Sequence, residues 1–383
     1  MRHLIRATVA SLAMIASFSV AVSAAGAFGS WTSTELRDTP GAQLQDADFR
    51  GRDVAVAWRE PGGLWVRTST DAGDSFAARE LVAGSGLEAE ADICGDDLFI
   101  SYREDLAEGH LIAVATRDVG ATGFEDLGVQ FSRQRVSHPD VACAGERLFV
   151  GWLQRVGDRD RIMVKHTYTR GAAFERGGAT DLGRASDYGA GPALAGVSDR
   201  AYLVSAHHTS GGSAPSIVLH RWSVGSGALA PVSYLGAKRI SKAGSRPVIA
   251  AAGDTVVVAW QGSNNGVKAR VSHDRGATWA RSRGVDPVAG GIEDAAFSPR
   301  SIAVRGSRIV LAYALEGCSF APPFECSSRE YLATTNDDFV TRKRTKLSNS
   351  ADDLVVGFVN VCGEPTLGAA LDKGSRVRFL RKD

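Results

Sequence analysis

The sequence is poor in sulfur and carries almost no net charge. Its 383 residues include only three methionines and five cysteines, and 44 basic residues balance 43 acidic ones to give a net charge of +1. Because the two signs are interspersed, the chain has no basic stripe of the kind that binds nucleic acid. Five cysteines cannot all pair within one chain. No spacing of metal ligands occurs either, and we predict neither a metal nor a cofactor.

Long apolar runs are also missing beyond the amino-terminal segment. The basic start MRHLIR is followed by the apolar run ATVASLAMIASFSVAV and the small residues VSAA. This pattern predicts a secretory signal peptide over residues 1–24, cleaved after Ala24, with no cysteine at the junction to take a lipid. No later apolar stretch approaches 18 residues. We therefore expect a secreted or periplasmic mature protein with no membrane span.

One eight-residue template recurs seven times along the chain. Each copy has two turn-forming residues, an alternating run rich in β-branched residues and, in the clear copies, a leading glycine and an aromatic residue seven positions later. The clear copies are GRDVAVAW (51–58), GDDLFISY (95–102), GERLFVGW (145–152), GDTVVVAW (253–260) and GSRIVLAY (306–313), and the weaker ones are SDRAYLVS (198–205) and GEPTLGAA (363–370). A repeat of 44 to 57 residues with period-2 alternation is typical of four-stranded propeller blades.

The seventh unit contains only three strands, and the mature amino terminus supplies the missing one. GSWTSTELRD (29–38) resembles the segment that forms the fourth strand in other units. We therefore predict an all-β, seven-bladed propeller over residues 29–383, with blades starting near residues 42, 87, 137, 189, 245, 297 and 354 and the last blade completed by residues 29–40. Such closure leaves no open sheet edge between first and last blades. A pair of β-sandwiches is the alternative, against which the regular period argues.

Two short stretches, STDAGDSF (69–76) and SHDRGATW (272–279), share the pattern Ser-x-Asp-x-Gly-x-Ser/Thr-aromatic. Weaker versions are TRDVGATGF (116–124), TYTRGAAF (167–174) and TTNDDF (334–339). These motifs resemble the Asp boxes, or bacterial neuraminidase repeats, of the sialidase-like β-propellers. The resemblance covers nearly the whole mature chain and implies a fold more strongly than a function.

A structural role for these motifs follows from their chemistry. Glycine supplies the left-handed backbone of a tight turn, and the aspartate and hydroxyl side chains accept hydrogen bonds from nearby backbone N–H groups. The aromatic residue buries its ring between strands. We assign this structural role to Ser69, Asp71, Gly73, Phe76, Ser272, Asp274, Gly276 and Trp279. The resemblance implies that these boxes lie on the face opposite an active site.

Candidate ligand-binding residues follow from the loops at the other end of the blades. Acidic residues gather at the starts of the innermost strands, at Asp46, Asp48, Glu88, Glu90, Asp92 and Asp140. A sialidase of the resembled family uses an arginine triad and an Arg-Ile-Pro signature in its first blade, and LQDADFRG has no such arginine. We predict ligand contacts at Arg59, Arg103, Glu104, Arg246, Arg300 and Asp352. The alternative is that each arginine only pairs with a neighbouring acid.

A second group combines histidine, aspartate and tyrosine on facing loops of the third and fourth blades. Such side chains can perform general acid–base chemistry on a glycan. We predict catalytic roles for His138, Asp140, Tyr188 and His207, beside His208. Exposed loop residues without a catalytic role are the alternative, and a metal held by the paired histidines has no supporting spacing.

The cysteines give a further prediction. Cys318 and Cys326 flank SFAPPFE within the longest loop, EGCSFAPPFECSSRE (316–330), and we predict a disulfide between them. Cys94, Cys143 and Cys362 lie in apolar stretches typical of strands, which favours buried thiols.

Two hypotheses for function therefore stay open. One is a protein that recognises, and as a glycoside hydrolase or lyase processes, an extracellular carbohydrate at the loop face around the central channel. The other is a non-enzymatic scaffold that binds an envelope protein through the same face. We expect a monomer in either case. An enzyme predicts a pocket with converging acids, whereas a scaffold predicts a flat, partly apolar top around residues 316–330.

Overall fold

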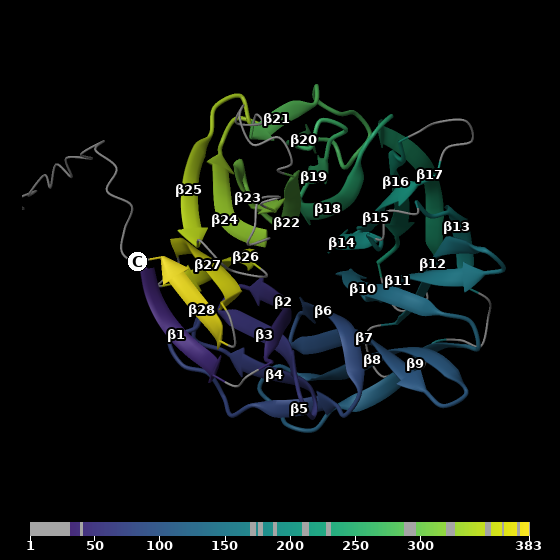
Figure 1. The fold of residues 1–383 in the computed structure, drawn as a ribbon, viewed down its shortest axis with the longest axis vertical. Coiled ribbons are helices and arrows are strands. Elements are labelled where there is room, and N and C mark those ends of the chain that lie inside the picture. The colour runs from purple at the N-terminus through teal and green to yellow at the C-terminus, as the bar shows by residue number, and fades with distance from the viewer. Residues whose placement is uncertain are drawn as a thin grey trace, which may run out of the picture.

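The computed structural model describes residues 31–38, 41–168, 174, 179–186, 190–208, 214–226, 231–286, 296–318, 326–348, 354–361, 364–373 and 376–382. All regular elements in these residues are β-strands, which form seven four-stranded antiparallel sheets arranged as blades in a ring (Figure 1). The predicted seven-bladed all-β propeller is confirmed. Among the described residues no helix is long and apolar enough to span a membrane.

Blades 1 to 3 each use four consecutive strands, from the innermost strand outward. Blade 1 consists of β2 (Gln43–Arg50), β3 (Asp53–Glu60), β4 (Gly63–Ser69) and β5 (Glu80–Ala83). Blade 2 consists of β6 (Gly86–Cys94), β7 (Asp97–Leu106), β8 (Gly109–Asp118) and β9 (Glu125–Ser132). Blade 3 consists of β10 (Val136–Ala144), β11 (Arg147–Val156), β12 (Arg159–Tyr168) and β13 (Thr180–Arg184).

Blades 4 to 6 have the same order. Blade 4 consists of β14 (Ala193–Val197), β15 (Arg200–His207), β16 (Ser216–Val224) and β17 (Val232–Ser241). Blade 5 consists of β18 (Ser245–Ala252), β19 (Thr255–Gln261), β20 (Val267–Ser272) and β21 (Arg283–Asp286). Blade 6 consists of β22 (Ala296–Arg305), β23 (Arg308–Cys318), β24 (Cys326–Thr335) and β25 (Lys343–Ser348).

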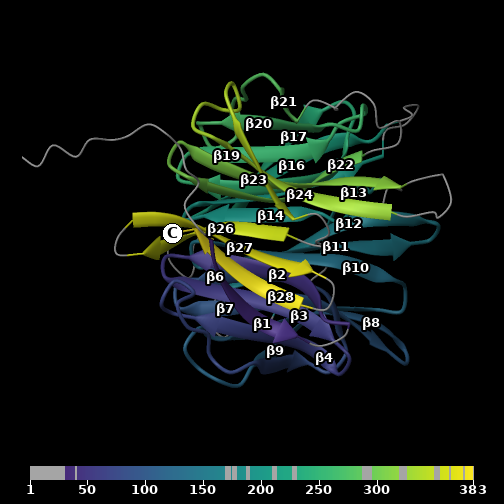
Figure 2. The ribbon, with the colours of Figure 1, turned by 60° about the vertical axis from the view of Figure 1, so that its left-hand side comes forward.

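Blade 7 joins the two ends of the chain. Its strands are β26 (Leu354–Val361), β27 (Glu364–Lys373), β28 (Arg376–Lys382) and β1 (Trp31–Asp38), and β1 pairs antiparallel with β28. Both views place the purple β1 beside the yellow β28 (Figures 1 and 2). The predicted closure of the ring by the amino-terminal strand is confirmed.

The template strands form the core because each is second in its blade and is covered by the neighbouring blades on both faces. In β3 the five residues from Val54 to Trp58 have no exposed surface. The template aromatics Trp152 and Trp260 are also fully buried. Strands covered on both faces read as near-continuous apolar runs rather than as an alternating pattern. This packing fixes the blades rigidly around the axis.

The first aspartate motif forms a closed, hydrogen-bonded turn between β4 and β5. The Ser69 hydroxyl accepts a hydrogen bond from the Gly73 N–H at 2.9 Å, and Asp71 Oδ1 accepts one from the Ser75 N–H at 2.9 Å. Gly73 has a φ of +85°, which favours glycine. The carboxylate of Asp71 is thus used within its own turn.

The second motif repeats these bonds, and a third copy follows β24. Asp274 Oδ1 accepts from the Thr278 N–H at 2.7 Å, and hydrogen bonds from Thr278 and Ser272 lower the pKa of Asp274 to about 2. In the third copy Asp337 plays the same part, while Phe339, with a φ of +63°, stands where the other copies have glycine. The Phe339 ring is buried in the core between blades 5 and 6, which compensates for the strained backbone.

A disulfide connects blades 2 and 3. Cys94 ends β6 and is bonded to Cys143 in β10, with 6.0 Å between their Cα atoms. The prediction of buried thiols at these two positions was wrong, because the innermost strands of adjacent blades run close together. Cys318 and Cys326 are partners in the register of β23 and β24. Their side chains, like Cys362, lie outside the described residues, so the loop disulfide stays a prediction.

Candidate functional site

A central cavity of about 770 Å³ lies on the axis of the ring and is lined by residues at or beside the innermost strands of all seven blades. Innermost strands are edge strands, so their inward N–H and C=O groups have no partner within their own sheet. Loops and strand starts on such a rigid scaffold are the usual place for binding residues. The cavity is therefore the candidate functional site.

Within the described residues, β-bulges interrupt five innermost strands in their first half. The pairing register shifts at the start of β2, β6, β10, β18 and β22. Residues within these shifts supply polar side chains to the cavity, namely Gln45, Glu88, His138, Arg246 and Arg300. Bulges re-aim side chains and are common next to active sites.

Three of the bulge residues have a strained backbone. Glu88, His138 and Arg246 have φ values of +52°, +50° and +48°, a region that residues with side chains rarely adopt. Such strain costs about 1–3 kcal/mol per residue and persists only where the surrounding structure enforces it. The packing of the ring thus holds these three side chains at the mouth of the cavity.

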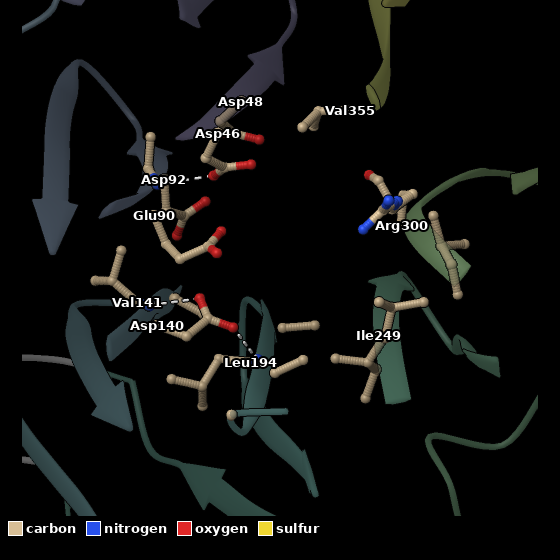
Figure 3. A pocket seen from close by; sticks show the side chains of 18 of the residues that line it. Asp46, Asp48, Glu90, Asp92, Asp140, Val141, Leu194, Ile249, Arg300 and Val355 are labelled. Atoms are coloured by element: carbon tan, nitrogen blue, oxygen red, sulfur yellow. Dashed lines mark hydrogen bonds between the residues drawn. The ribbon is translucent and has the colours of Figure 1, made fainter. Parts of the chain in front are cut away.

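Below the bulges, the acidic residues that line the cavity within the described part of the chain all lie on one side of it. The residues at equivalent register positions in blades 1 to 3 are Asp46, Glu90 and Asp140, whereas blades 4 to 7 have uncharged residues there, namely Ala193, Val248, Ser301 and Val356. Two residues further along, Asp48 and Asp92 extend the acidic side of blades 1 and 2. Figure 3 shows these five carboxylates together on one side of the cavity, and we call them the acidic arc.

The carboxylates of the arc accept hydrogen bonds from the next blade. Asp46 accepts from the Ala91 N–H at 2.8 Å, Asp92 from the Cys143 N–H at 2.7 Å, and Asp140 from the Leu194 N–H at 2.6 Å. These N–H groups belong to innermost edge strands. The arc therefore ties blade 1 to 2, 2 to 3 and 3 to 4 while it lines the cavity.

Burial of these carboxyl groups in the cavity wall also changes their protonation. Burial raises the pKa of Asp46 to about 8, although the Ala91 N–H opposes this, and burial raises the pKa of Asp140 to about 7 against the N–H groups of Leu194 and Val141. Burial likewise raises the pKa of Asp48 and that of Asp92. At neutral pH the arc thus retains protons and carries less negative charge than five free carboxylates would.

Two arginines lie across the cavity from the arc. Arg300 comes from β22 and faces the carboxylates from the opposite side in Figure 3. Arg246 comes from β18 and donates a hydrogen bond to the Ser298 hydroxyl at 2.7 Å. The cavity is therefore polarised, with acids on blades 1 to 3 and cations on blades 5 and 6.

His138 lies at the mouth of the cavity on the acidic side. Its backbone N–H donates to Glu88 Oε2 at 2.7 Å, and its buried Nδ1 makes no hydrogen bond with any described residue. Burial lowers the pKa of His138, opposed by Glu88 and assisted by Arg135 and Arg103. The imidazole is therefore neutral at pH 7 and available as a proton acceptor.

The structure brings together only part of the predicted site. His138, Asp140, Arg246 and Arg300 line the cavity, whereas Tyr188 and Asp352 lie outside the described residues. The repeat places the acids of blades 1 and 2 on the loop face, but our sequence-based prediction does not include them among the site residues. Their spacing of two residues on one strand is the signal that would have identified them, since alternate residues share a strand face.

Three of the predicted ligand contacts lie beside the cavity rather than in it. Arg103 pairs with Glu88 at 2.9 Å, and Glu104 accepts a hydrogen bond from the Ser85 hydroxyl. Arg59 is exposed at the end of β3 and lines a separate, smaller cavity. The arginines predicted to act together are thus separated: Arg246 and Arg300 line the central cavity, whereas Arg59 lines the smaller one.

His207 does not line the cavity. It lies within blade 4, where its Nε2 is 3.2 Å from Nε2 of His220, and His220 Nδ1 is 2.8 Å from the Tyr234 hydroxyl. His220 is buried and its ring stacks on that of His207 with centroids 5.3 Å apart. The strand geometry of β15 directs His207 toward β16 instead of toward the axis.

This histidine pair predicts a loss of stability in acid. Burial lowers the pKa of both His207 and His220 to about 4, so the unfolded chain takes up protons at a higher pH than the folded one. The contribution of the two neutral histidines to the free energy of unfolding is complete above about pH 6.5. It is lost as the pH falls toward 4, and for His220 the loss is about 2–3 kcal/mol. We expect the loss of unfolding free energy between pH 7 and pH 4.5, measured by urea denaturation, to be smaller in His220→Gln than in the wild type. Equal losses in the two proteins would contradict the prediction. The carboxyl groups of the arc change stability in the opposite direction with pH, but they do so equally in the variant and the wild type, so their effect is removed when the two losses are subtracted.

Comparisons with known proteins support the fold alone. No protein-family model matches the chain, and no curated protein has a significantly similar sequence. Among solved structures, an ulvan lyase, which is a polysaccharide lyase and was solved bound to -[GlcA(1-4)Rha3S]-, is 8% identical, with a TM-score of 0.53 over 90% of this chain and 94% of that one. The phage phi92 endosialidase is 10% identical, with a TM-score of 0.51 over 93% of this chain and 69% of that one. Both share the fold of this chain.

Proposed function

We propose that this chain binds an acidic carbohydrate in the central cavity and acts on it by proton transfer. The observation that supports this function is the polarised cavity, with Arg300 opposite the acidic arc in Figure 3 and Arg246 supplied by β18 of blade 5. A guanidinium group binds a carboxylate or sulfate through two parallel hydrogen bonds. Carboxyl groups, in turn, bind sugar hydroxyls. An acidic sugar needs both kinds of partner.

The raised pKa values of the arc make an anionic ligand compatible with five nearby carboxyl groups. At pH 7 Asp46 and Asp140 retain protons that ordinary carboxyl groups would have lost, since burial raises the pKa of these groups to about 8 and about 7. Protonated carboxyls repel an anion less and donate hydrogen bonds. The ligand of the similar ulvan lyase, -[GlcA(1-4)Rha3S]-, belongs to the same chemical class as the ligand proposed here.

His138 is the proposed proton acceptor of a β-elimination. It takes the proton from the ring carbon beside the carboxylate of the sugar, the C–O bond to the leaving sugar breaks as a C=C bond forms, and the protonated carboxyl group of Asp140 gives its proton to the leaving oxygen. The imidazole of His138 is neutral because burial lowers its pKa, and the strained backbone of this residue holds it at the mouth of the cavity. Neighbouring groups whose pKa values are displaced in opposite directions mark acid–base sites, and Asp140 is two residues away on the same strand. The alternative function, a protein-binding scaffold, depends on residues 316–330, most of whose side chains lie outside the described residues.

The first test measures binding of a tetrasaccharide made of two GlcA(1-4)Rha3S repeats at pH 7 by isothermal titration calorimetry. We expect Arg300→Ala to weaken binding about 10- to 100-fold, as the loss of charged hydrogen bonds implies. Arg342→Ala is the control, because Arg342 is exposed and follows the third aspartate turn, away from the cavity. Equal affinity for neutral cellotetraose, or no binding of the acidic oligosaccharide, would reject the function.

The same oligosaccharide tests proton transfer. Release of new chain ends should fall about 100-fold or more in His138→Gln, in the range seen when a general base is removed. The dissociation constant should stay within about threefold of the wild-type value, because the substitution keeps a polar side chain. A wild-type chain that binds the oligosaccharide and never cleaves it would restrict the function to recognition.

A further inference from the structure

A second cavity of about 570 Å³ lies between blades 1 and 2 on the loop face. Along β2, Gln43 lines this groove and the next residue, Leu44, lines the central cavity. Along β6, Leu87 lines the groove and Glu88 the central cavity. The groove and the central cavity are thus lined by adjacent residues on both strands, so the groove lies directly beside the central cavity.

Glycine is the most frequent residue in the lining of the groove. Five of its residues are glycines, namely Gly41, Gly62, Gly63, Gly84 and Gly86. Without side chains, the peptide N–H and C=O groups of these segments are within reach of a ligand. Such a lining suits a ligand with many hydroxyl groups better than a purely apolar one.

The acidic residues of the groove are already paired. Glu60 is buried and held by Arg37 at 2.7 Å and by Arg79. Asp105 pairs with Arg103 at 3.2 Å, and also with a histidine.

Arg59, in contrast, is exposed and has no ion pair among the described residues. The charge that the groove leaves uncompensated is therefore the positive charge of Arg59. An anionic substituent on a ligand is the natural partner for it.

We infer that this groove is a second subsite for the ligand of the central cavity, and that the ligand is a chain of at least several acidic sugars rather than a single one. This inference rests on the proposed function. One acidic unit is held in the central cavity, and the chain continues between blades 1 and 2, where Arg59 contacts the next carboxylate or sulfate.

The test compares ligands of two lengths, one and two GlcA(1-4)Rha3S repeats, in a variant with a blocked groove. Gly84→Trp is expected to fill the groove without backbone strain, because Gly84 has no left-handed φ and a Cβ atom added there meets no atom within 4 Å. Gly120→Trp is the matched control, since Gly120 is equally open and exposed but follows β8 at the opposite end of the blade.

We expect the wild type and Gly120→Trp to bind the tetrasaccharide at least about tenfold tighter than the disaccharide. In Gly84→Trp the affinity for the tetrasaccharide should fall to that for the disaccharide, whose own affinity should not change. Arg59→Ala should reduce the preference for the longer ligand about five- to tenfold, as the loss of about 1–1.4 kcal/mol would.

The outcomes separate this inference from the proposed function. If both ligands bind equally well, or if Gly84→Trp leaves tetrasaccharide binding unchanged while Arg300→Ala weakens it, the second subsite is rejected and the central site stands. If the wild type binds neither ligand, both the central site and the subsite are rejected.

Discussion

Replacing both Cys94 and Cys143 by alanine is expected to lower the free energy of unfolding by about 4 kcal/mol. The disulfide closes a loop with a sequence separation of 49 residues. Cross-linking a loop of this length removes about 4 kcal/mol of conformational entropy from the unfolded chain, on the loop-closure estimate. Guanidinium denaturation under non-reducing conditions, followed by tryptophan fluorescence, measures the loss.

The single variants provide the control for this result. Cys94→Ala and Cys143→Ala each break the same bond, so each should lose about as much stability as the double variant. Such strong non-additivity distinguishes a shared bond from two independent packing effects. The prediction is wrong if the losses of unfolding free energy in the two single variants add up to the loss in the double variant. It is also wrong if the double variant is as stable as the wild type.

The position of this disulfide could have been derived from the repeat. Cys94 directly precedes Gly95 of one template copy, and Cys143 lies two residues before Gly145 of the next. The two cysteines therefore lie at positions one residue apart in the repeat, on the innermost strands of adjacent blades, which run side by side. The sequence favours the pair Cys318 and Cys326 when closeness along the chain is the only measure of distance.

The fold was predictable because each of the seven template copies indicates the same four-stranded unit. Each template copy carries the same apolar run and the same turn, so a deviation in one copy is outweighed by the others. Ring closure followed from a missing fourth strand in the last copy and a spare strand at the amino terminus, and β1 pairs with β28 accordingly. A residue or turn that occurs in only one copy of the repeat cannot be recognised by comparison with the other copies.

The site was predictable only in part, for reasons that lie in the backbone. Arg246, Arg300 and His138 reach the cavity because register shifts turn the starts of their strands, and such shifts depend on packing between blades. His207 was placed on the same loop face from its position after the template. Strand alternation instead directs it toward His220, a partner 13 residues away that no motif identifies.

Replacing Gly196 by alanine is expected to destabilise the fold by about 3 kcal/mol or more, the cost of overpacking a dense interior. Gly196 lies on β14 in blade 4, and an added methyl group would overlap the carbonyl oxygen of Cys143 in blade 3. Because that contact is with backbone, no rotation of a side chain can relieve it. Blade 4 must move away from blade 3, and thermal unfolding measures the resulting loss.

Gly128→Ala is the matched control, since Gly128 also lies within a strand, β9, where an added methyl group meets no atom within 4 Å. It should be neutral or stabilising by about 0.5 kcal/mol, as alanine is less flexible than glycine in the unfolded chain. The comparison also bears on the site, because Leu194 of the same strand donates to Asp140. If blade 4 moves, that bond lengthens and Asp140 loses an N–H group that favours its ionised form, so Gly196→Ala should also raise the pKa of Asp140 further. A Gly196→Ala protein as stable as Gly128→Ala would show that blades 3 and 4 are not in such close contact.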